Sequence, residues 1–263
     1  ILRFIVPETF GMGAGRREPG RRFNEIEKNV ELTRSFYLGE KEISNRSFKQ
    51  FDPGHDSGLL GRALLSEEDR PVVNISWEEA TRFCNWLSEK DGLPTAYALK
   101  DGQWRLRSPV TIGYRLPTEA EWAWAARYAS KKKPTRFPWG DNMPPSAGSG
   151  NYADVSAANM VPYSIKAYND NFRGPAPSGT YAPNELGIFD LAGNVSEWIN
   201  DYYSVELHRE TLVDPLGPTQ GDYYVIRGSN YTHGRFSELR WTFRDYGLDP
   251  RPDVGFRIAR FVE

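Results

Sequence analysis

Residues 114–122 read Tyr-Arg-Leu-Pro-Thr-Glu-Ala-Glu-Trp, and residues 193–198 read Gly-Asn-Val-Ser-Glu-Trp. In the first stretch Thr118 precedes Glu121 by three residues, which is the pattern of a capping box at the start of a helix. Apolar residues then recur at helical spacing, at Trp122, Ala125, Ala126 and Ala129. The sequence therefore predicts a helix that starts after Thr118 and ends at the lysine run 131–133, where the helix dipole favours positive charge.

A second helix is predicted after Ser76, which forms a capping box with Glu79. The apolar side chains of its buried face lie at helical spacing, at Ala80, Phe83, Cys84 and Leu87. Cys84 is the single cysteine of the chain, so no disulfide forms within it. A thiol on a buried face is a core group, because a reactive thiolate needs a polar and partly exposed setting.

Composition predicts one compact, loop-rich domain. The chain has 263 residues, 24 glycines, 19 prolines and 14% aromatic residues. Its net charge of −2 excludes the electrostatic footprint of a nucleic-acid or anionic-membrane protein, and no run of 18 apolar residues predicts a membrane span. The region 134–230 is rich in proline, and loops of that length are usually tied down by function, by metal ions or by buried aromatic rings.

Strands are expected at residues 1–6, 224–227 and 255–259, which are apolar, with a turn at 10–13. Between them the arginines of residues 16–22 make a basic loop. This loop is interpreted either as a solvated segment or as an anion site.

Several further short sequence phrases follow one another along the chain. They are Phe10-Gly11-Met12-Gly13, Glu42-Ile43-Ser44-Asn45, Pro138-Trp139-Gly140-Asp141, Arg227-Gly228-Ser229 and Gly255-Phe256-Arg257. With the two opening stretches, they make the chain resemble the formylglycine-generating-enzyme (sulfatase-modifying-factor) family from about residue 5 to residue 260. The resemblance implies a single α+β domain over 1–263, low in regular secondary structure and related to the C-type lectin fold.

The resemblance also bears on context. Bacterial members often follow other modules, so we expect this domain, which opens at Ile1 and not at methionine, to be cut from a longer or processed chain. The residues themselves do not reveal the compartment. The resemblance favours a periplasmic or cell-envelope location over the cytoplasm.

The copper chemistry of the family depends on two cysteines shortly after the Arg-Gly-Gly-Ser phrase. Here residues 227–240 contain no cysteine. Aligned from the left, His233 takes the first cysteine's place; aligned from Arg240 and Arg244, it shifts by about two residues. Because Cu(I) selects thiolates, we expect no copper and no formylglycine-generating activity.

Calcium is the metal that the resemblance implies, since hard cations bind carboxylate, amide and carbonyl oxygens on irregular loops. The first expected set is Asn151, Tyr152, Asp170 and Phe172, and the second is Gly193, Asn194, Val195 and Glu197. For Asn151 the alternative is a turn-capping side chain. For Glu197 it is a buried ion pair with an arginine.

Two functions from different classes follow. The first is a calcium-stabilised binding or scaffold module whose pocket for a peptide, protein or glycan is lined by Trp139, Tyr231, His233, Trp241 and Arg244. The same aromatic residues are alternatively part of the core. The second is an enzyme with altered, metal-dependent oxidation chemistry of the pyoverdine-maturation type, using His233, Glu238 and Arg235. The other histidines, His55 and His208, are far from His233 in sequence.

Overall fold

The structure, a computed structural model, describes residues 1–128 and 134–262. Its helices are α1 (Asn45–Phe48), α2 (Trp77–Lys90) and α3 (Glu119–Arg127). Both predicted capping boxes are confirmed, with Ser76 and Thr118 as the N-cap residues. The predicted end of α3 at 129–133 lies outside the described residues. The N-cap residue of α1 is Ser44, in the Glu-Ile-Ser-Asn phrase.

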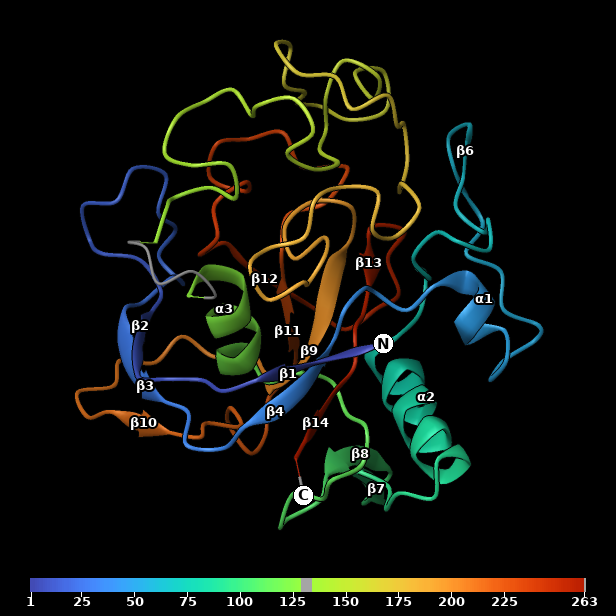
Figure 1. The fold of residues 1–263 in the computed structure, drawn as a ribbon, viewed down its shortest axis with the longest axis vertical. Helices are drawn as coiled ribbons and strands as arrows, with labels where there is room; N and C mark the ends of the chain where they lie inside the picture. Colours follow the sequence, from blue (N-terminus) through green and yellow to red (C-terminus); the bar gives the residue numbers. More distant parts are fainter. Residues whose placement is uncertain (129–133, 263) are drawn as a thin grey trace.

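The strands form small sheets that join distant parts of the chain (Figure 1). One sheet has the order β1 (Leu2–Ile5), β4 (Phe36–Gly39), β14 (Ala259–Phe261), and another the order β10 (Leu212–Val213), β3 (Lys28–Glu31), β2 (Phe10–Met12). The largest has the order β12 (Arg244–Gly247), β11 (Tyr224–Arg227), β9 (Ser196–Tyr202), β13 (Val254–Gly255). Two-stranded sheets are formed by β5 (Leu59–Leu60) with β6 (Ala63–Leu64), and by β7 (Tyr97–Lys100) with β8 (Gln103–Leu106).

Two predictions about strands need correction. Residues 10–12 form strand β2, and the turn comes only at Gly13, whose φ is 99°. The predicted strand 255–259 is two short strands, β13 and β14, separated by residues 256–258. The break lets Val254 and Gly255 pair in parallel with β9, whereas Ala259 pairs with Leu38 in the sheet of β4.

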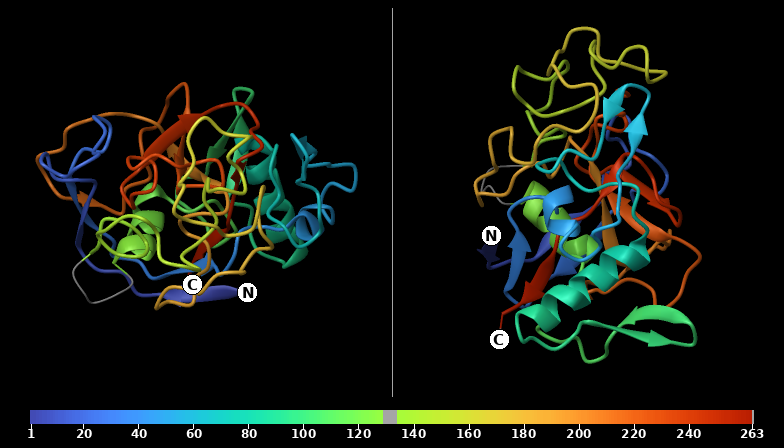
Figure 2. Two further views of the ribbon diagram at one scale, coloured as in Figure 1. Left: turned by 90° about the horizontal axis from the view of Figure 1, so that it is seen from above. Right: turned by 90° about the vertical axis from the view of Figure 1, so that its right-hand side faces the viewer.

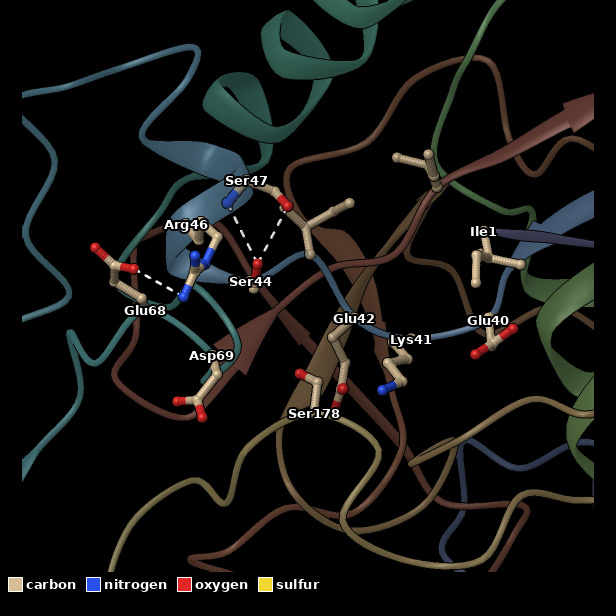
Figure 3. Close-up of a pocket in the computed structure, with 13 residues that line it drawn as sticks. Ile1, Glu40, Lys41, Glu42, Ser44, Arg46, Ser47, Glu68, Asp69 and Ser178 are labelled. Carbon is tan, nitrogen blue, oxygen red and sulfur yellow. Dashed lines mark hydrogen bonds and ion pairs between the residues drawn. The ribbon is translucent and has the colours of Figure 1, made fainter.

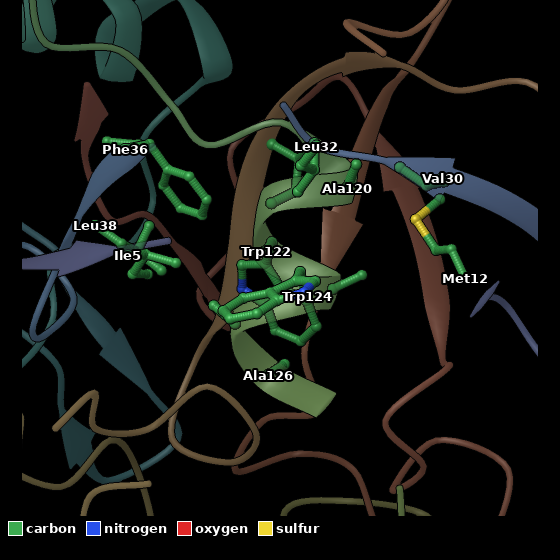
Figure 4. Close-up of a cluster of buried hydrophobic side chains, with 14 of the residues drawn as sticks. Ile5, Met12, Val30, Leu32, Phe36, Leu38, Ala120, Trp122, Trp124 and Ala126 are labelled. Carbon is green, nitrogen blue, oxygen red and sulfur yellow. The ribbon is translucent and has the colours of Figure 1, made fainter. Parts of the chain in front are cut away.

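α3 lies in the middle of the larger core (Figure 4). Trp122 and Trp124 lie between Ile5 and Phe36 on one side and Val30 on the other. Eight of its nine residues are buried, so the helix is enclosed all round, whereas the apolar spacing predicted a single buried face.

A second core covers one side of α2. As predicted, Cys84 is fully buried there, and burial raises the pKa of its thiol. We predict that the native protein will not react with an aromatic disulfide reagent on the timescale of exposed thiols, and that one thiol will react after unfolding. Rapid labelling of the native chain would contradict this placement.

Residues 134–195, all described, contain no helix or strand. Most of their loops lie in the upper half of Figure 1, away from β7 and β8 at the bottom, and the right-hand view of Figure 2 shows the same separation. A cluster of buried aromatic and aliphatic side chains ties them down, at Phe137, Tyr152, Ile165, Tyr168 and Leu239. The structure thus has the irregular α+β architecture that was expected.

Candidate functional site

The residues around His233 form a closed polar cluster. The imidazole is 9% exposed and packs edge-on against Phe243, with ring centroids 5.1 Å apart. Its neighbour Asn230 donates hydrogen bonds to Asp253 at 3.0 Å and to Ser196 at 2.8 Å. Burial lowers the pKa of His233, so the imidazole is neutral at physiological pH. The Nδ1 atom has no hydrogen-bond partner among the described residues.

The other two predicted acid–base groups point to partners of their own. Glu238 forms a 3.3 Å ion pair with Arg22 and accepts a hydrogen bond from the backbone N–H of Arg235. The Arg235 guanidinium lies 3.9 Å from the centre of the Tyr163 ring. Arg22 also lies over the Phe243 ring. Arg22 therefore packs the basic loop against Glu238 and Phe243. Neither interpretation of the loop, as a solvated segment or as an anion site, predicted this contact.

The charged neighbours of His233 were missed by the sequence analysis. Arg251 forms ion pairs with Asp253 and with Asp245, each at 2.8 Å. Asp253 directly precedes β13, and its position just before the Gly-Phe-Arg phrase is the one sequence signal that could have marked it. Both carboxylates are paired with Arg251, so neither is a free base beside the imidazole.

The remaining predicted pocket residues lie in different parts of the core. Tyr231 is 1% exposed and donates a hydrogen bond to the carbonyl of Pro252. Trp139 stacks on Phe137 with ring centroids 5.0 Å apart, and Trp241 packs against the cluster around α3. The contacts of these aromatic residues agree with the alternative interpretation, in which they are part of the core.

Arg244 is also held internally, by a bidentate ion pair with Glu119. Its guanidinium donates a further hydrogen bond to the carbonyl of Ser204 at 2.9 Å. With Tyr231 and both tryptophans in separate contacts, the structure does not bring the five predicted ligand-binding residues together into one pocket.

The first expected calcium set does converge. The Asp170 carboxylate accepts hydrogen bonds from the backbone N–H groups of Tyr152 and Phe172, at 2.9 and 2.8 Å. A second buried carboxylate, that of Asp154, accepts from the backbone N–H of Asp170 and was not anticipated. Asn151 is fully buried, and its Oδ1 has no hydrogen-bond partner among the described residues.

The charge of this group is not balanced by protein cations. Within residues 1–128 and 134–262, neither Asp154 nor Asp170 forms an ion pair. Burial, together with the nearby Asp154 charge, raises the pKa of Asp170 to about 7. Two buried carboxyls and an unpartnered amide oxygen are the donor set that a hard cation prefers, so the residues fit calcium.

The second expected set does not fit an ion at its carboxylate. Arg257 donates to both Glu197 oxygens, at 2.8 and 2.6 Å, and the indole N–H of Trp122 donates to one of them at 2.9 Å. Glu197 and Arg257 are both fully buried. In addition, the Asn194 carbonyl accepts from the N–H of Tyr231. The ion-pair alternative therefore describes Glu197.

Val195 and Gly193 play structural parts in the same segment. Val195 packs against Tyr231 in a small buried cluster, and the Gly193 N–H donates to the carbonyl of Ser229. The φ of Gly193 is 104°, and a Cβ there would lie 3.1 Å from the carbonyl oxygen of Asn151. A glycine is needed so that the two loops can approach this closely.

A chain of side-chain amides connects the first set to a cavity of about 420 Å³. Asn151 donates to Asn194, and Asn194 donates to Glu42 at 3.1 Å. In Figure 3 Glu42 lies beside Ser178 on the cavity wall, and neither the Oε2 of Glu42 nor the hydroxyl of Ser178 has a hydrogen-bond partner among the described residues. Burial raises the pKa of Glu42 well above its usual range.

Another cavity, of about 300 Å³, holds the buried carboxyl of Asp201. Burial and the nearby Glu119 charge raise the pKa of Asp201 to about 7. The folded chain therefore retains this proton up to about pH 7, whereas the unfolded chain loses it near pH 4. Stability contributed by this group is lost as the pH rises through that window.

We predict that Asp201→Asn will raise the melting temperature by roughly 2–5 °C at pH 8 and by less at pH 5, because the amide carries no charge to bury. Thermal melts at both pH values measure this. The exposed Asp249→Asn is the matched control and should shift neither melt. An equal effect of Asp201→Asn at both pH values would contradict the assignment.

Two findings limit the chemistry. Among the described residues, no group of three or more His, Cys, Asp or Glu side chains lies close enough together to hold a metal ion. No helix in the described part of the chain is long and apolar enough to cross a membrane. Fold and site together define an irregular α+β domain with a fully buried arginine–glutamate pair near its centre and no thiol in residues 227–240.

The model of the sulfatase-modifying factor enzyme 1-like domain matches residues 4–262, and the chain belongs to this family. It is 31% identical over 178 residues to formylglycine-generating enzyme of Mus musculus, covering 68% of this chain and 38% of that protein. It is 30% identical over 249 residues to chaperone protein LppX of Paenibacillus barcinonensis, covering 89% and 82%. The chain thus spans less than half the length of the mouse enzyme.

Solved structures show the same fold. PvdO from Pseudomonas aeruginosa superposes with a TM-score of 0.75 at 18% identity, covering 99% of this chain and 94% of that chain. Treponema denticola variable protein 1 superposes with a TM-score of 0.71 at 23% identity, covering 98% and 94%. At these identities the similarity concerns the fold alone.

Proposed function

We propose that this chain is a non-catalytic binding module of its family, stabilised by calcium, that recognises a peptide, protein or glycan. The observation that carries the proposal is that the charged side chains around His233 are already paired with one another. Asp245 and Asp253 pair with Arg251, and Glu238 pairs with Arg22. Among the described residues, the carboxylates around the imidazole are thus all paired with arginine, and none is free to work with His233 in general acid–base catalysis.

Calcium in this proposal is held by Asn151, Asp170 and the carbonyls of Tyr152 and Phe172, with Asp154 nearby. Bound there, the cation would neutralise the two buried carboxyls and order the loops of residues 134–195. We place no ion on Glu197, because both of its oxygens are already paired with the Arg257 cation, whereas Asp170 accepts only from backbone N–H groups among the described residues.

A binding role in a longer, envelope-associated chain agrees with two relatives. One is named a chaperone, and a chaperone works by binding other chains. The other, serine/threonine-protein kinase Pkn1 of Chlamydia trachomatis, is 30% identical over 286 residues, which cover 99% of this chain but only 38% of that protein. Both relatives are bacterial, and the kinase, of which the match covers only 38%, supports a module that is joined to other domains.

The test is a turnover assay with a cysteine-containing sulfatase peptide, copper and oxygen. We expect no conversion of the cysteine to an aldehyde, measured by mass spectrometry and carbonyl labelling, while a cysteine-bearing family oxidase converts the same peptide. Aldehyde formation by this chain would overturn the proposal.

The second candidate is an enzyme with altered, metal-dependent chemistry at His233. The unpartnered Nδ1 atom favours it, because a neutral imidazole is the commonest metal ligand. Elemental analysis of the purified protein separates the two candidates. Stoichiometric iron or copper that is lost in His233→Ala would support the enzyme, and calcium alone would support the binding module.

A further inference from the structure

Four aromatic side chains from distant parts of the chain form a ridge beside β8. Strands β7 and β8 lie at one end of the molecule (Figure 1). Tyr224 stacks between Trp77 and Tyr202, with ring centroids 3.8 Å and 4.7 Å apart. Trp104 lies beside them and donates its indole N–H to Glu78 at 3.1 Å. Tyr202, Tyr224 and Trp104 are only partly buried, so their rings reach the surface.

Cavities lie on both sides of this ridge, and all four rings line both. One cavity has a volume of about 610 Å³ and the other about 550 Å³. We call the two together the aromatic groove. Strands β7 and β8, which carry part of its lining, lie far from most of the loops of residues 134–195, as the right-hand view of Figure 2 also shows. The groove includes none of the residues around His233.

The larger lobe of the groove is basic. Lys100, Arg105 and Arg107 line it, and no acidic residue does. No carboxylate within residues 1–128 and 134–262 forms an ion pair with any of the three. Three unpaired cations in one concave lobe of a chain with net charge −2 favour an anionic ligand group. Arginine in particular matches the planar geometry of a carboxylate.

The smaller lobe has the opposite character. Glu78 and Asp222 line it, together with Gln103, and no cation does. A polyanion along the whole groove would be repelled here, whereas hydroxyl groups can donate to these carboxylates and to the amide. The basic lobe adds Asn200, Ser108 and Thr219 as further polar side chains.

We propose that the aromatic groove binds a short saccharide, with a uronate unit in the basic lobe and a neutral unit in the acidic lobe. Apolar sugar faces would pack on the exposed rings, and hydroxyl edges would meet the polar side chains. A peptide with the same charge order is the alternative that the test must exclude, because Leu106, Leu216 and Pro218 also line the basic lobe. This proposal rests on the binding function proposed above and names its site and ligand class.

The test is calorimetric titration of the protein with uronate tetrasaccharides against the neutral tetramers chitotetraose and cellotetraose. The uronate ligands are that of hyaluronan, in which acidic and neutral units alternate, and that of polygalacturonate, whose continuous charge the acidic lobe should disfavour. We expect at least one uronate ligand to bind at least tenfold more tightly than its neutral counterpart, with affinity that falls as salt increases. Arg105→Gln should weaken binding about tenfold or more. Arg62→Gln, which removes an exposed arginine outside the groove, should leave it unchanged.

A second measurement guards against a folding defect in the variants. In NMR spectra of the wild-type protein, the Trp104 indole signal should shift on addition of the uronate ligand and not on addition of the neutral one. Equal binding of neutral and acidic sugars, or no binding of any, would overturn the proposal. Binding of an acidic peptide and of no saccharide would also overturn it. In that case the ligand would be a peptide, and the proposed binding function would still hold. The aldehyde assay fails or succeeds independently of these outcomes.

Discussion

Replacing Glu197 by glutamine should lower the free energy of unfolding by about 3–5 kcal/mol, because it leaves the buried Arg257 cation without its counter-charge. Among the described carboxylates, Arg257 makes hydrogen bonds to Glu197 alone, at 2.6 and 2.8 Å. Neither side chain is exposed to solvent. Chemical denaturation at neutral pH measures the effect as a shift of the midpoint with an unchanged slope.

The size of the effect follows from what the pair connects. Arg257 also donates to the carbonyls of Gly39 and Phe189, at 3.0 and 2.9 Å, and Glu197 accepts from Trp122 on α3. Strands β4 and β9, the loop before β9 and the central helix therefore meet at one ion pair. Its loss should loosen all of them together.

The matched control is the exposed pair between Arg46 and Glu68, whose side chains are 68% and 62% exposed. Glu68→Gln should change stability by less than about 1 kcal/mol, because an exposed pair gains little over hydration. A double variant, Glu197→Leu with Arg257→Met, should recover much of the loss, since it leaves no unpaired charge. If Glu197→Gln were as mild as Glu68→Gln, the pair would not be the central contact described here.

The helices of this fold could be predicted because their signals are local. A capping box and the apolar spacing that follows it lie within a dozen residues. Helices α2 and α3 both begin where the capping boxes at Ser76 and Thr118 predicted. The sheets could not be predicted in the same way. Strand β4 pairs with residues near both ends of the chain. No local pattern predicts that Leu38 pairs with Arg3 on one side and with Ala259 on the other.

The candidate sites also differ in how far they could be predicted, because some of their residues have local sequence signals and others have only distant partners. The Asn151–Asp170 set came from a family resemblance that places two loop segments together, and the structure adds Asp154, an aspartate with no local signal. Glu197 could be interpreted in two ways because its partner, Arg257, lies 60 residues away. The rings of the aromatic groove come from α2, β8, β9 and β11, and each looks like a core residue in its own segment.

Removing calcium should lower the melting temperature by about 5–10 °C. A cation held at one hundred times its dissociation constant adds about 2.7 kcal/mol to the folded state, and a chain of this length loses about 2–4 °C per kcal/mol. The physical reason is the pair of buried carboxyls at Asp154 and Asp170, which form no ion pair within the part of the chain that the structure describes. Differential scanning calorimetry with a chelator, then with calcium restored, measures the shift.

Variants locate the ion. Asp170→Asn should abolish the response to chelator, and its melt in chelator should match or exceed that of the wild-type chain, since one buried charge is gone. Asp249→Asn, an exposed change, should keep the full response. Asn151→Leu tests the unpartnered amide oxygen in the same way and should reduce calcium affinity. A chelator response that persists in Asp170→Asn and Asn151→Leu would place the cation elsewhere, and a melt unaffected by chelator in the wild-type chain would remove calcium from the proposed function altogether.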